Sequence, residues 1–147
     1  MKKLDTKSEI EFLKELHADP QAEKTYALLR ESFNVLQTRS QMLIGLVTIC
    51  LTITGFSGIK IAESCLPAKV SIFIGVCSTL ITALLLVSGP LNLQWLSQYR
   101  ADTLEATLQE LILRRDRRTK TYHHASLCLI IGLGAYTLSL AFYLLFS

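Results

Sequence analysis

Three long stretches without a charged side chain constrain this fold more than any other feature of the sequence. They run from Met42 to Ile59, from Val70 to Tyr99 and from Ala125 to Ser147, and nearly all charged residues lie in segments 1–41 and 100–120. A helix of about 20 apolar residues, rising about 1.5 Å per residue, crosses a hydrocarbon core of about 30 Å. The sequence therefore predicts an all-α integral membrane protein with three transmembrane helices. Buried helices of a soluble core are the alternative, and the segregation of charge disfavours them.

The charged segments complete the predicted organisation. Two of the three membrane helices are expected to continue into the cytoplasm, where they form a helical stalk. The predicted order is N-terminal cytoplasmic helices at 1–41, transmembrane helix 1 at 42–61, an outer hairpin loop at 62–69, transmembrane helix 2 at 70–90, a cytoplasmic helical segment with a basic cluster at 91–124, and transmembrane helix 3 at 125–147.

The placement of Lys and Arg predicts the orientation in the membrane. Loops on the cytoplasmic side carry an excess of these residues. Three of them lie between residues 20 and 41, five lie in the seven positions from Arg114 to Lys120, and only Lys60 and Lys69 lie between the first two apolar stretches. We therefore expect a cytoplasmic N-terminus and an outside C-terminus. The compact spans flanked by cations suit a bacterial inner membrane.

The same cations are candidates for contacts with anionic headgroups of the lipid bilayer. Nucleic-acid binding is not expected, because no aromatic residues are interleaved with the basic cluster. The candidate lipid contacts are Arg39, Arg114, Arg115, Arg117, Arg118 and Lys120.

A nearly continuous helix is predicted from Pro20 to about Ile61, because no proline follows Pro20 until Pro67 and no glycine precedes Gly45. Asp19 is expected to cap its start. A capping box at residues 6–9 predicts a short helix before it. The stalk part of the long helix carries apolar residues at spacings of three and four, as in a coiled coil, namely Ala22, Tyr26, Leu29, Phe33 and Leu36.

A second stalk helix is predicted after Asp102, where the sequence DTLE has the form of a helix cap. The two stalk helices are expected to pack against each other. As a helix, residues 91–101 rise only about 16 Å, whereas residues 103–124 rise about 33 Å. We therefore expect that the third long helix cannot match the first stalk turn for turn. The apolar stripe of the second stalk helix consists of Leu104, Leu108, Leu111 and Ile112.

Each apolar stretch carries a stripe of small or weakly polar residues at helical spacing. Helices in lipid associate where such residues allow close backbone approach. We favour the interpretation that the three stripes face one another within one chain. A pore lined by the first stripe in a homo-oligomer, and packing between chains, are the alternatives. The stripes are Gly45, Thr48, Thr52 and Gly55; Ser71, Gly75, Ser78 and Thr82; and Ala125, Cys128, Gly132, Ala135 and Ser139.

No catalytic site, metal site or cofactor is expected. The four cysteines lack C-x-x-C spacing, His17 is expected to be solvated, and His123 and His124 point about 100° apart on a helix. The apolar stretches contain no Asp, Glu, Lys, Arg or His, which argues against coupled transport. A membrane-bound enzyme acting on lipid is a third alternative, and its best polar cluster is Arg39, Asp116, His123 and His124.

These patterns favour a non-enzymatic membrane protein that acts as an oligomeric assembly or interaction subunit through its cytoplasmic helices. The partner is expected to be a copy of the chain or another membrane-associated protein. The alternative is a homo-oligomeric ion channel or pore lined by the face of transmembrane helix 1 that carries Thr48 and Thr52. The interface candidates are Tyr26, Leu29, Phe33 and Leu36 on the first stalk helix and Leu104, Leu108 and Leu111 on the second.

Overall fold

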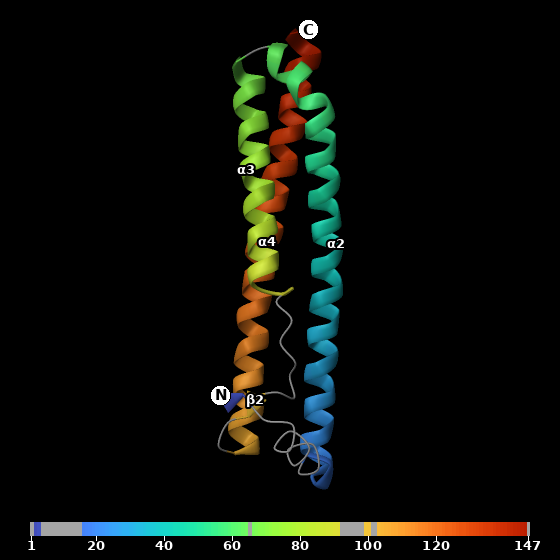
Figure 1. Cartoon of the computed structure of the whole chain (residues 1–147), viewed down its shortest axis with the longest axis vertical. Coiled ribbons are helices and arrows are strands. Elements are labelled where there is room, and N and C mark those ends of the chain that lie inside the picture. Colours follow the sequence, from blue (N-terminus) through green and yellow to red (C-terminus); the bar gives the residue numbers. More distant parts are fainter. Residues whose placement is uncertain (1, 4–15, 65, 92–98, 101–102, 147) are drawn as a thin grey trace.

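The computed structural model describes residues 2–3, 16–64, 66–91, 99–100 and 103–146, and it is built on three long helices (Figure 1). They are α2 (Pro20–Ser64), α3 (Leu66–Ser88) and α4 (Leu104–Phe146). At about 1.5 Å per residue, α2 and α4 are about 65 Å long and α3 is about half that length. Each contains a segment long and apolar enough to cross a membrane. The predicted helical fold with three helices of membrane-spanning length is thus confirmed.

The start of α2 follows the predicted capping chemistry. The Asp19 carboxylate accepts hydrogen bonds from the backbone amides of Gln21 at 2.9 Å and Ala22 at 3.3 Å. Pro20 occupies the first helical position, where a missing N–H costs nothing. The helix then runs without a break to Ser64, three residues beyond the predicted end. The predicted helix after the capping box at residues 6–9 falls outside the described residues, apart from its end at 16–18, which is helical.

Two boundaries differ from the predicted ones. The outer hairpin is tighter than the predicted loop at 62–69, because α2 continues to Ser64 and α3 already begins at Leu66. Pro67 does not prevent this, since proline is tolerated in the first turn of a helix. The next long helix after α3 is α4, which begins at Leu104. The Thr103 hydroxyl accepts a hydrogen bond from the backbone amide of Ala106 at 3.2 Å. Thr103 therefore caps α4.

The helices α2 and α4 run parallel and stay level along their length. The guanidinium carbon of Arg118 lies 5.4 Å from the centre of the Phe33 ring, and Tyr136 faces the same cavity as Thr54. Facing residues of α4 and α2 therefore differ in number by 85 for Arg118 and Phe33 and by 82 for Tyr136 and Thr54, which is nearly the same offset. The expectation that the third helix cannot match the first stalk turn for turn is therefore wrong.

That expectation assumed too short a distance between the end of α3 and the start of α4. Gly89, just after α3, lies against Thr121, because a Cβ on Gly89 would be 2.7 Å from Thr121 Cγ2. Leu104 precedes Thr121 by 17 residues, or about 26 Å along α4. The start of α4 therefore lies much farther from α3 than the helical rise of about 16 Å assumed for residues 91–101.

The helices α3 and α4 pack antiparallel and closely, through small residues. A Cβ on Gly132 would lie 3.4 Å from the carbonyl oxygen of Gly75, which shows that the two backbones are in near contact. Thr82 Oγ1 lies 2.9 Å from the carbonyl oxygen of Ser78 in its own helix and 3.3 Å from that of Ala125 across the interface, so its one proton is shared between the two acceptors. Ser139 Oγ makes a longer contact of 3.5 Å with the carbonyl of Ala68. The stripes of the second and third apolar stretches therefore face each other, as expected.

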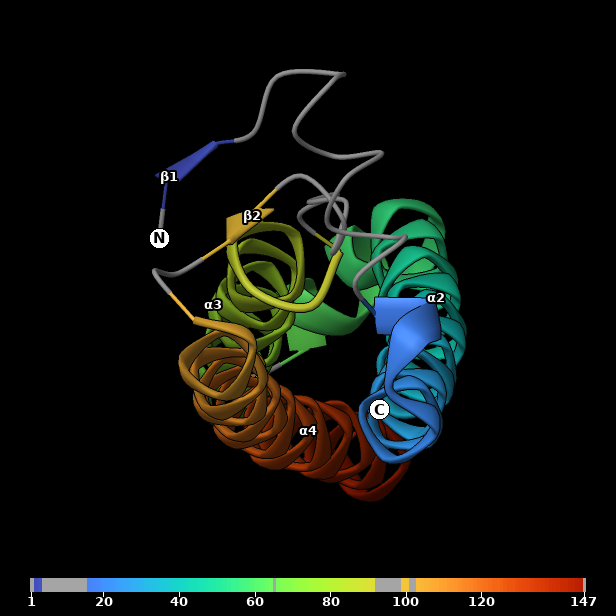
Figure 2. The ribbon, with the colours of Figure 1, turned by 90° about the horizontal axis from the view of Figure 1, so that it is seen from below.

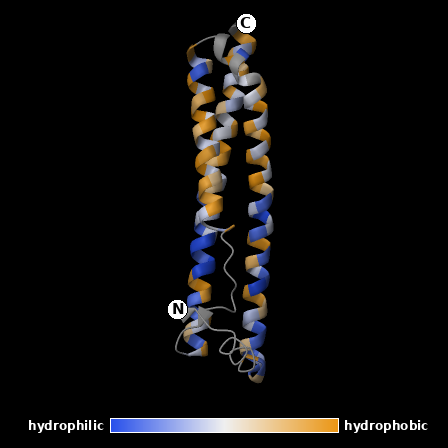
Figure 3. Ribbon diagram, in the orientation of Figure 1, coloured by the Kyte–Doolittle hydropathy of each residue, from blue (hydrophilic) through white to orange (hydrophobic). Residues whose placement is uncertain are grey.

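The stalk forms below this pair, where α2 and α4 continue beyond α3. On α2, Leu29, Phe33 and Leu36 are buried, and on α4, Thr107 and Leu111 are buried. The two helices lie side by side in this part of the molecule, where the guanidinium carbon of Arg118 is 5.4 Å from the centre of the Phe33 ring. Hydrophilic residues concentrate in this half of the molecule and hydrophobic residues in the half that includes α3 (Figure 3).

A small feature was not predicted from the sequence. Strand β1 (Lys2–Lys3) pairs antiparallel with β2 (Tyr99–Arg100), with Lys2 opposite Arg100 and Lys3 opposite Tyr99. Two residues per strand give no alternation that a sequence could reveal.

Seen along the long axis, the three helices surround the bundle axis and do not lie in a single layer (Figure 2).

The close contact of α3 and α4 gives a first prediction. Gly132→Leu is expected to destabilise the protein by about 1–3 kcal/mol through overpacking, because a Cβ there already lies 3.2 Å from Thr79 Cγ2. Gly134→Leu is the matched control, since a Cβ on Gly134 meets nothing within 4 Å. Thermal unfolding in detergent, followed by far-UV circular dichroism, should show a lower midpoint only for Gly132→Leu. Equal midpoints would contradict the contact.

Candidate functional site

The small residues of α2 do not join the other two stripes. Gly45, Thr48, Thr52 and Gly55 are all exposed on the outside of the bundle. A Cβ added to Gly45 or Gly55 would meet nothing within 4 Å. The face that α2 turns inward instead includes Ser40, Val47 and Gly58. The favoured interpretation, in which all three stripes face one another within one chain, is therefore wrong for α2. We call these four exposed residues the α2 small-residue face.

The hydroxyl groups on this face are satisfied within the helix. Thr48 Oγ1 donates to the carbonyl of Ile44, and Thr52 Oγ1 donates to the carbonyl of Thr48, both at 2.9 Å. Such bonds to the residue four positions earlier occupy the only donor of each hydroxyl. The α2 small-residue face therefore presents methyl groups and bare glycine backbone, and it can contact an apolar surface without leaving a donor unpaired.

The stalk residues predicted to bind a partner are mostly used inside the chain. Leu29, Phe33, Leu36 and Leu111 are 1–8 % exposed. Tyr26, Leu104 and Leu108 are partly buried. Pairing of α2 with α4 covers these faces, so they are not available to a second copy as continuous seams. The matched register of α2 and α4, which was not predicted from the sequence, brings these faces together.

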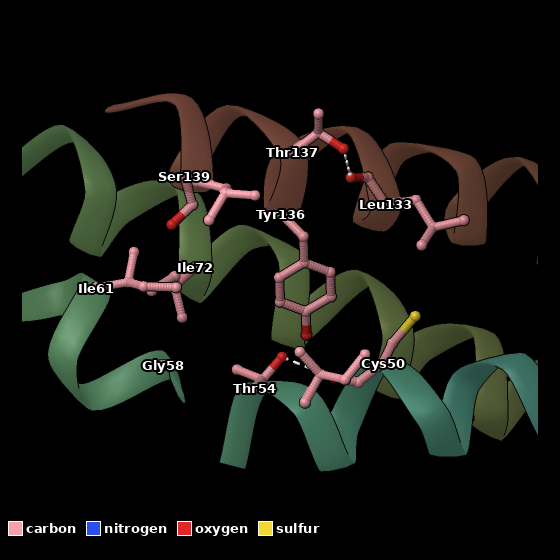
Figure 4. Close-up of a pocket in the computed structure, with 11 residues that line it drawn as sticks. Cys50, Thr54, Gly58, Ile61, Ile72, Leu133, Tyr136, Thr137 and Ser139 are labelled. Atoms are coloured by element: carbon pink, nitrogen blue, oxygen red, sulfur yellow. Dashed lines mark hydrogen bonds between the residues drawn. The ribbon is translucent and has the colours of Figure 1, made fainter. Parts of the chain in front are cut away.

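A cavity of about 260 Å³ lies between α2 and the pair α3 and α4 in the apolar half (Figure 4). The side chain of Tyr136 reaches from α4 toward Cys50 and Thr54 of α2. Its hydroxyl is buried and has no hydrogen-bond partner among the described residues. The Thr54 hydroxyl donates to the carbonyl of Cys50 at 2.8 Å, so its own proton is occupied. Tyr136 therefore holds an unsatisfied polar atom at the centre of the bundle.

Tyr136 was not predicted as a site residue, although the sequence contains a signal for it. It is the one tyrosine in the middle of the third apolar stretch, whereas Tyr143 lies near its end. A tyrosine hydroxyl normally finds a partner or reaches the interface. Gly75 explains how the ring fits, because a Cβ on Gly75 would lie 3.0–3.1 Å from three ring atoms of Tyr136. The glycine of α3 thus makes room for the tyrosine of α4.

The basic cluster of α4 divides between two sides of the helix. Arg114, Arg117 and Arg118 line a cavity of about 500 Å³ at the end of α3. Arg115 turns to another side, where its guanidinium donates to Asp116 at 2.8 and 3.0 Å. Lys120 is exposed. The cluster therefore does not act as one uniform patch.

A second basic cavity, of about 540 Å³, lies between the stalk helices. Arg39 and Glu31 line it from α2, and Arg115, Tyr122 and His123 line it from α4. The four residues considered for a lipid-modifying enzyme are not gathered there. Arg39 and His123 share the cavity, but Asp116 is paired with Arg115, and His124 Nδ1 lies 2.7 Å from the carbonyl oxygen of Lys120.

The remaining polar chemistry is sparse. His17 is exposed, as expected, and it lies 3.0 Å from the Glu23 carboxylate, an ion pair when the histidine is protonated. Within the part of the chain that the structure describes, no group of three or more His, Cys, Asp or Glu side chains is placed to hold a metal ion. No protein-family model, curated protein or solved structure matches the chain.

The unsatisfied hydroxyl gives a second prediction. Tyr136→Phe removes a buried donor that has no partner, so the midpoint of thermal unfolding in detergent is expected to stay the same or rise. Thr82→Val is the contrasting variant. It removes a buried hydroxyl that does have acceptors, the carbonyl oxygens of Ser78 at 2.9 Å and Ala125 at 3.3 Å, and it should cost about 1 kcal/mol. A loss in Tyr136→Phe as large as in Thr82→Val would show that the hydroxyl has a bound partner.

Proposed function

We propose that this chain is a non-enzymatic integral membrane protein that assembles with copies of itself through the α2 small-residue face. The observation that carries the proposal is that this face lies open on the outside of the bundle, while the corresponding stripes of α3 and α4 are packed against each other. Assembly through the stalk seams, the version favoured by the sequence, is replaced by assembly within the membrane, because those seams are covered inside the chain.

The chemistry of the face supports helix association better than simple contact with lipid. Helices in a bilayer gain no hydrophobic free energy by associating, so they depend on close packing of small residues. Other outward positions in the apolar half carry large side chains, such as Ile53 on α2 beside the small residues, Phe73 on α3 and Ile130 on α4. Those residues suit lipid, whereas the small residues of α2 suit a second helix.

The spacing of the face also suggests the geometry of the contact. Gly45, Thr48, Thr52 and Gly55 are separated by three, four and three residues, which is the heptad period. A heptad seam favours a left-handed crossing at about +20°. Two α2 helices crossing in this way would extend the packing of the bundle from one protomer into the next.

The orientation proposed for the membrane follows the cations. The stalk and basic cluster would lie in the cytoplasm, and the hairpin between α2 and α3 and the C-terminus would lie outside. A bacterial inner membrane suits this arrangement, because an anionic cytoplasmic leaflet attracts the arginines of α4. The proposed partners are the lipid bilayer and other copies of the chain.

The second candidate function is a homo-oligomeric pore lined by the same face. The observation that favours it is that Thr48 and Thr52 both lie on the exposed side of α2. Hydroxyl oxygens can line a selective path without charged rings. Because both hydroxyl protons are already donated within the helix, only oxygen lone pairs would face such a path.

The assembly proposal predicts the effect of filling the glycine positions. The wild-type protein in detergent is expected to have the mass of a discrete oligomer, measured by light scattering corrected for bound detergent. Gly45→Leu with Gly55→Leu is expected to reduce this mass to that of one chain, because the new side chains prevent close backbone approach. Gly134→Leu, also in open space, is the control and should leave the oligomer intact. A double variant with the wild-type mass would contradict the proposal.

Thiol labelling separates assembly from the pore. Thr48→Cys and Thr52→Cys are introduced singly into a chain whose four native cysteines are replaced by serine or alanine. The membrane-embedded protein is then treated with a water-soluble, membrane-impermeant thiol reagent. Packing between helices predicts no reaction at either position. Rapid reaction at both positions would favour the pore over the assembly contact.

A further inference from the structure

The cavity between α2 and the pair α3 and α4, here called the interhelix cavity, is much larger than a single water molecule requires. Its volume is about 260 Å³, whereas one buried water needs about 10–15 Å³ of such space. An apolar cavity of about 150 Å³ already binds benzene. By proportion, the interhelix cavity has room for an organic molecule of about ten non-hydrogen atoms.

Apolar side chains form most of the wall of this cavity. They come from all three helices, namely Ile53 and Ile61 on α2, Ile72 on α3, and Leu133 and Leu140 on α4. The described lining residues include no charged side chain. An apolar space with a few polar groups is typical of sites that bind small molecules.

One hydroxyl on the wall has a proton to offer. The hydroxyl protons of Thr54 and Thr137 are donated to carbonyl oxygens of their own helices, at 2.8 and 2.9 Å. The Tyr136 hydroxyl is buried and has no hydrogen-bond partner among the described residues. A hydrocarbon environment offers no water to an unpaired group, and leaving such a group unpaired is costly. A molecule in the cavity that supplies an acceptor would remove this cost.

The ring of Tyr136 is held in place before any ligand binds. Gly75 lies against it, because a Cβ on Gly75 would be 3.0–3.1 Å from three ring atoms. From this position on α4 the hydroxyl points toward Thr54 and Cys50 of α2 (Figure 4). A donor fixed in this way binds an acceptor with little further loss of conformational freedom.

The cavity can be reached from the side. Ile53 of α2 and Leu133 and Leu140 of α4 line it, and they are also exposed on the outside of the bundle. The cavity therefore opens between α2 and α4, where a bilayer would surround the apolar half. A molecule dissolved in the bilayer can enter without passing through water.

The depth of Tyr136 distinguishes between sources of the acceptor. Tyr136 lies 11 residues, or about 16 Å, beyond the start of the third apolar stretch at Ala125. In a hydrocarbon core of about 30 Å, this is near the middle. The ester carbonyls of phospholipids lie at the edges of the core and do not reach this depth. The acceptor must therefore belong to a molecule that dissolves in the core itself.

We propose that the interhelix cavity binds a neutral, lipid-soluble molecule that carries a carbonyl oxygen, and that the Tyr136 hydroxyl donates a hydrogen bond to this oxygen. A carbonyl group suits the site because it accepts a hydrogen bond and brings no donor of its own, so no new unpaired proton enters the apolar space. The cavity uses no residue of the α2 small-residue face, so this proposal can fail while the assembly proposal holds, and the reverse is also true.

The test compares two ligands of nearly the same shape. They are 4-fluoroacetophenone, which has a carbonyl oxygen, and 4-fluoro-α-methylstyrene, which has a methylene group in its place. Each is titrated into the full-length protein in lipid nanodiscs and followed by fluorine NMR, with empty nanodiscs as the measure of partition into lipid. The wild-type protein is expected to bind the ketone at least about fivefold more tightly, the ratio typical of one buried hydrogen bond.

Tyr136→Phe keeps the shape of the ring and removes the donor, so it is expected to bind the two ligands about equally. Tyr143→Phe is the matched control, because it removes a tyrosine hydroxyl from the same helix without touching the described cavity lining. It should keep the wild-type preference. Absence of binding in the wild-type protein, or a preference for the ketone that survives in Tyr136→Phe, would overturn the proposal. Equal binding of both ligands by the wild-type protein would also overturn it and assign the hydroxyl to a buried water.

Two further measurements make the result independent of affinity alone. The infrared stretching band of the ketone carbonyl is expected to shift to lower frequency in the wild-type protein and in Tyr143→Phe, but not in Tyr136→Phe. Thr54→Phe fills the cavity from the side of α2 and is expected to abolish binding of both ligands while helical content stays at the wild-type level. Binding that persists in a folded Thr54→Phe variant would place the ligand elsewhere and contradict the site.

Discussion

The close approach of α3 and α4 is the contact on which the other features depend. Gly132 lies against Gly75 and Thr79, and the resulting antiparallel pair leaves α2 to pack along one side. Because the pair uses the small residues of both its helices, α2 meets it through a different face, and the small residues of α2 remain outside. The ring of Tyr136 lies in the space that remains between the pair and α2. The packing of α3 against α4 therefore determines both the inner cavity and which residues of α2 lie outside.

Much of this arrangement could be predicted from the sequence, and the exceptions have physical reasons. The start of α2 follows from Asp19 and Pro20, and stalk pairing follows from apolar spacing, because both depend on local chemistry. Periodicity shows which residues share a helix face, but it does not show what that face contacts. Both Val47 and Thr48 belong to regular stripes of α2, and only packing decides that Val47 is buried. The outward position of Gly45 and Gly55 was therefore beyond sequence reasoning.

The register between α2 and α4 in the stalk could not be predicted from the sequence either, because it depends on the distance between Gly89 and Leu104. The division of the basic cluster has a similar origin. The sequence shows five cations in seven positions, and the helical period of α4 separates them. Three face the end of α3, and Arg115 faces the other stalk helix and pairs with Asp116. The basic cluster, which is one run of cations in the sequence, thus lines two separate cavities in the structure.

The continuity of α2 has a mechanical consequence. The helix passes from the stalk into the apolar half without an interruption, with about 22 residues before Met42 and about as many after it. The helix is straight over most of its length, and its last turns bend toward α3 (Figure 1). A contact that tilts the end of α2 at Pro20 by a few degrees would therefore also displace the part of α2 in the apolar half. Because α4 is nearly as long as α2 and level with it, the two helices would tilt together.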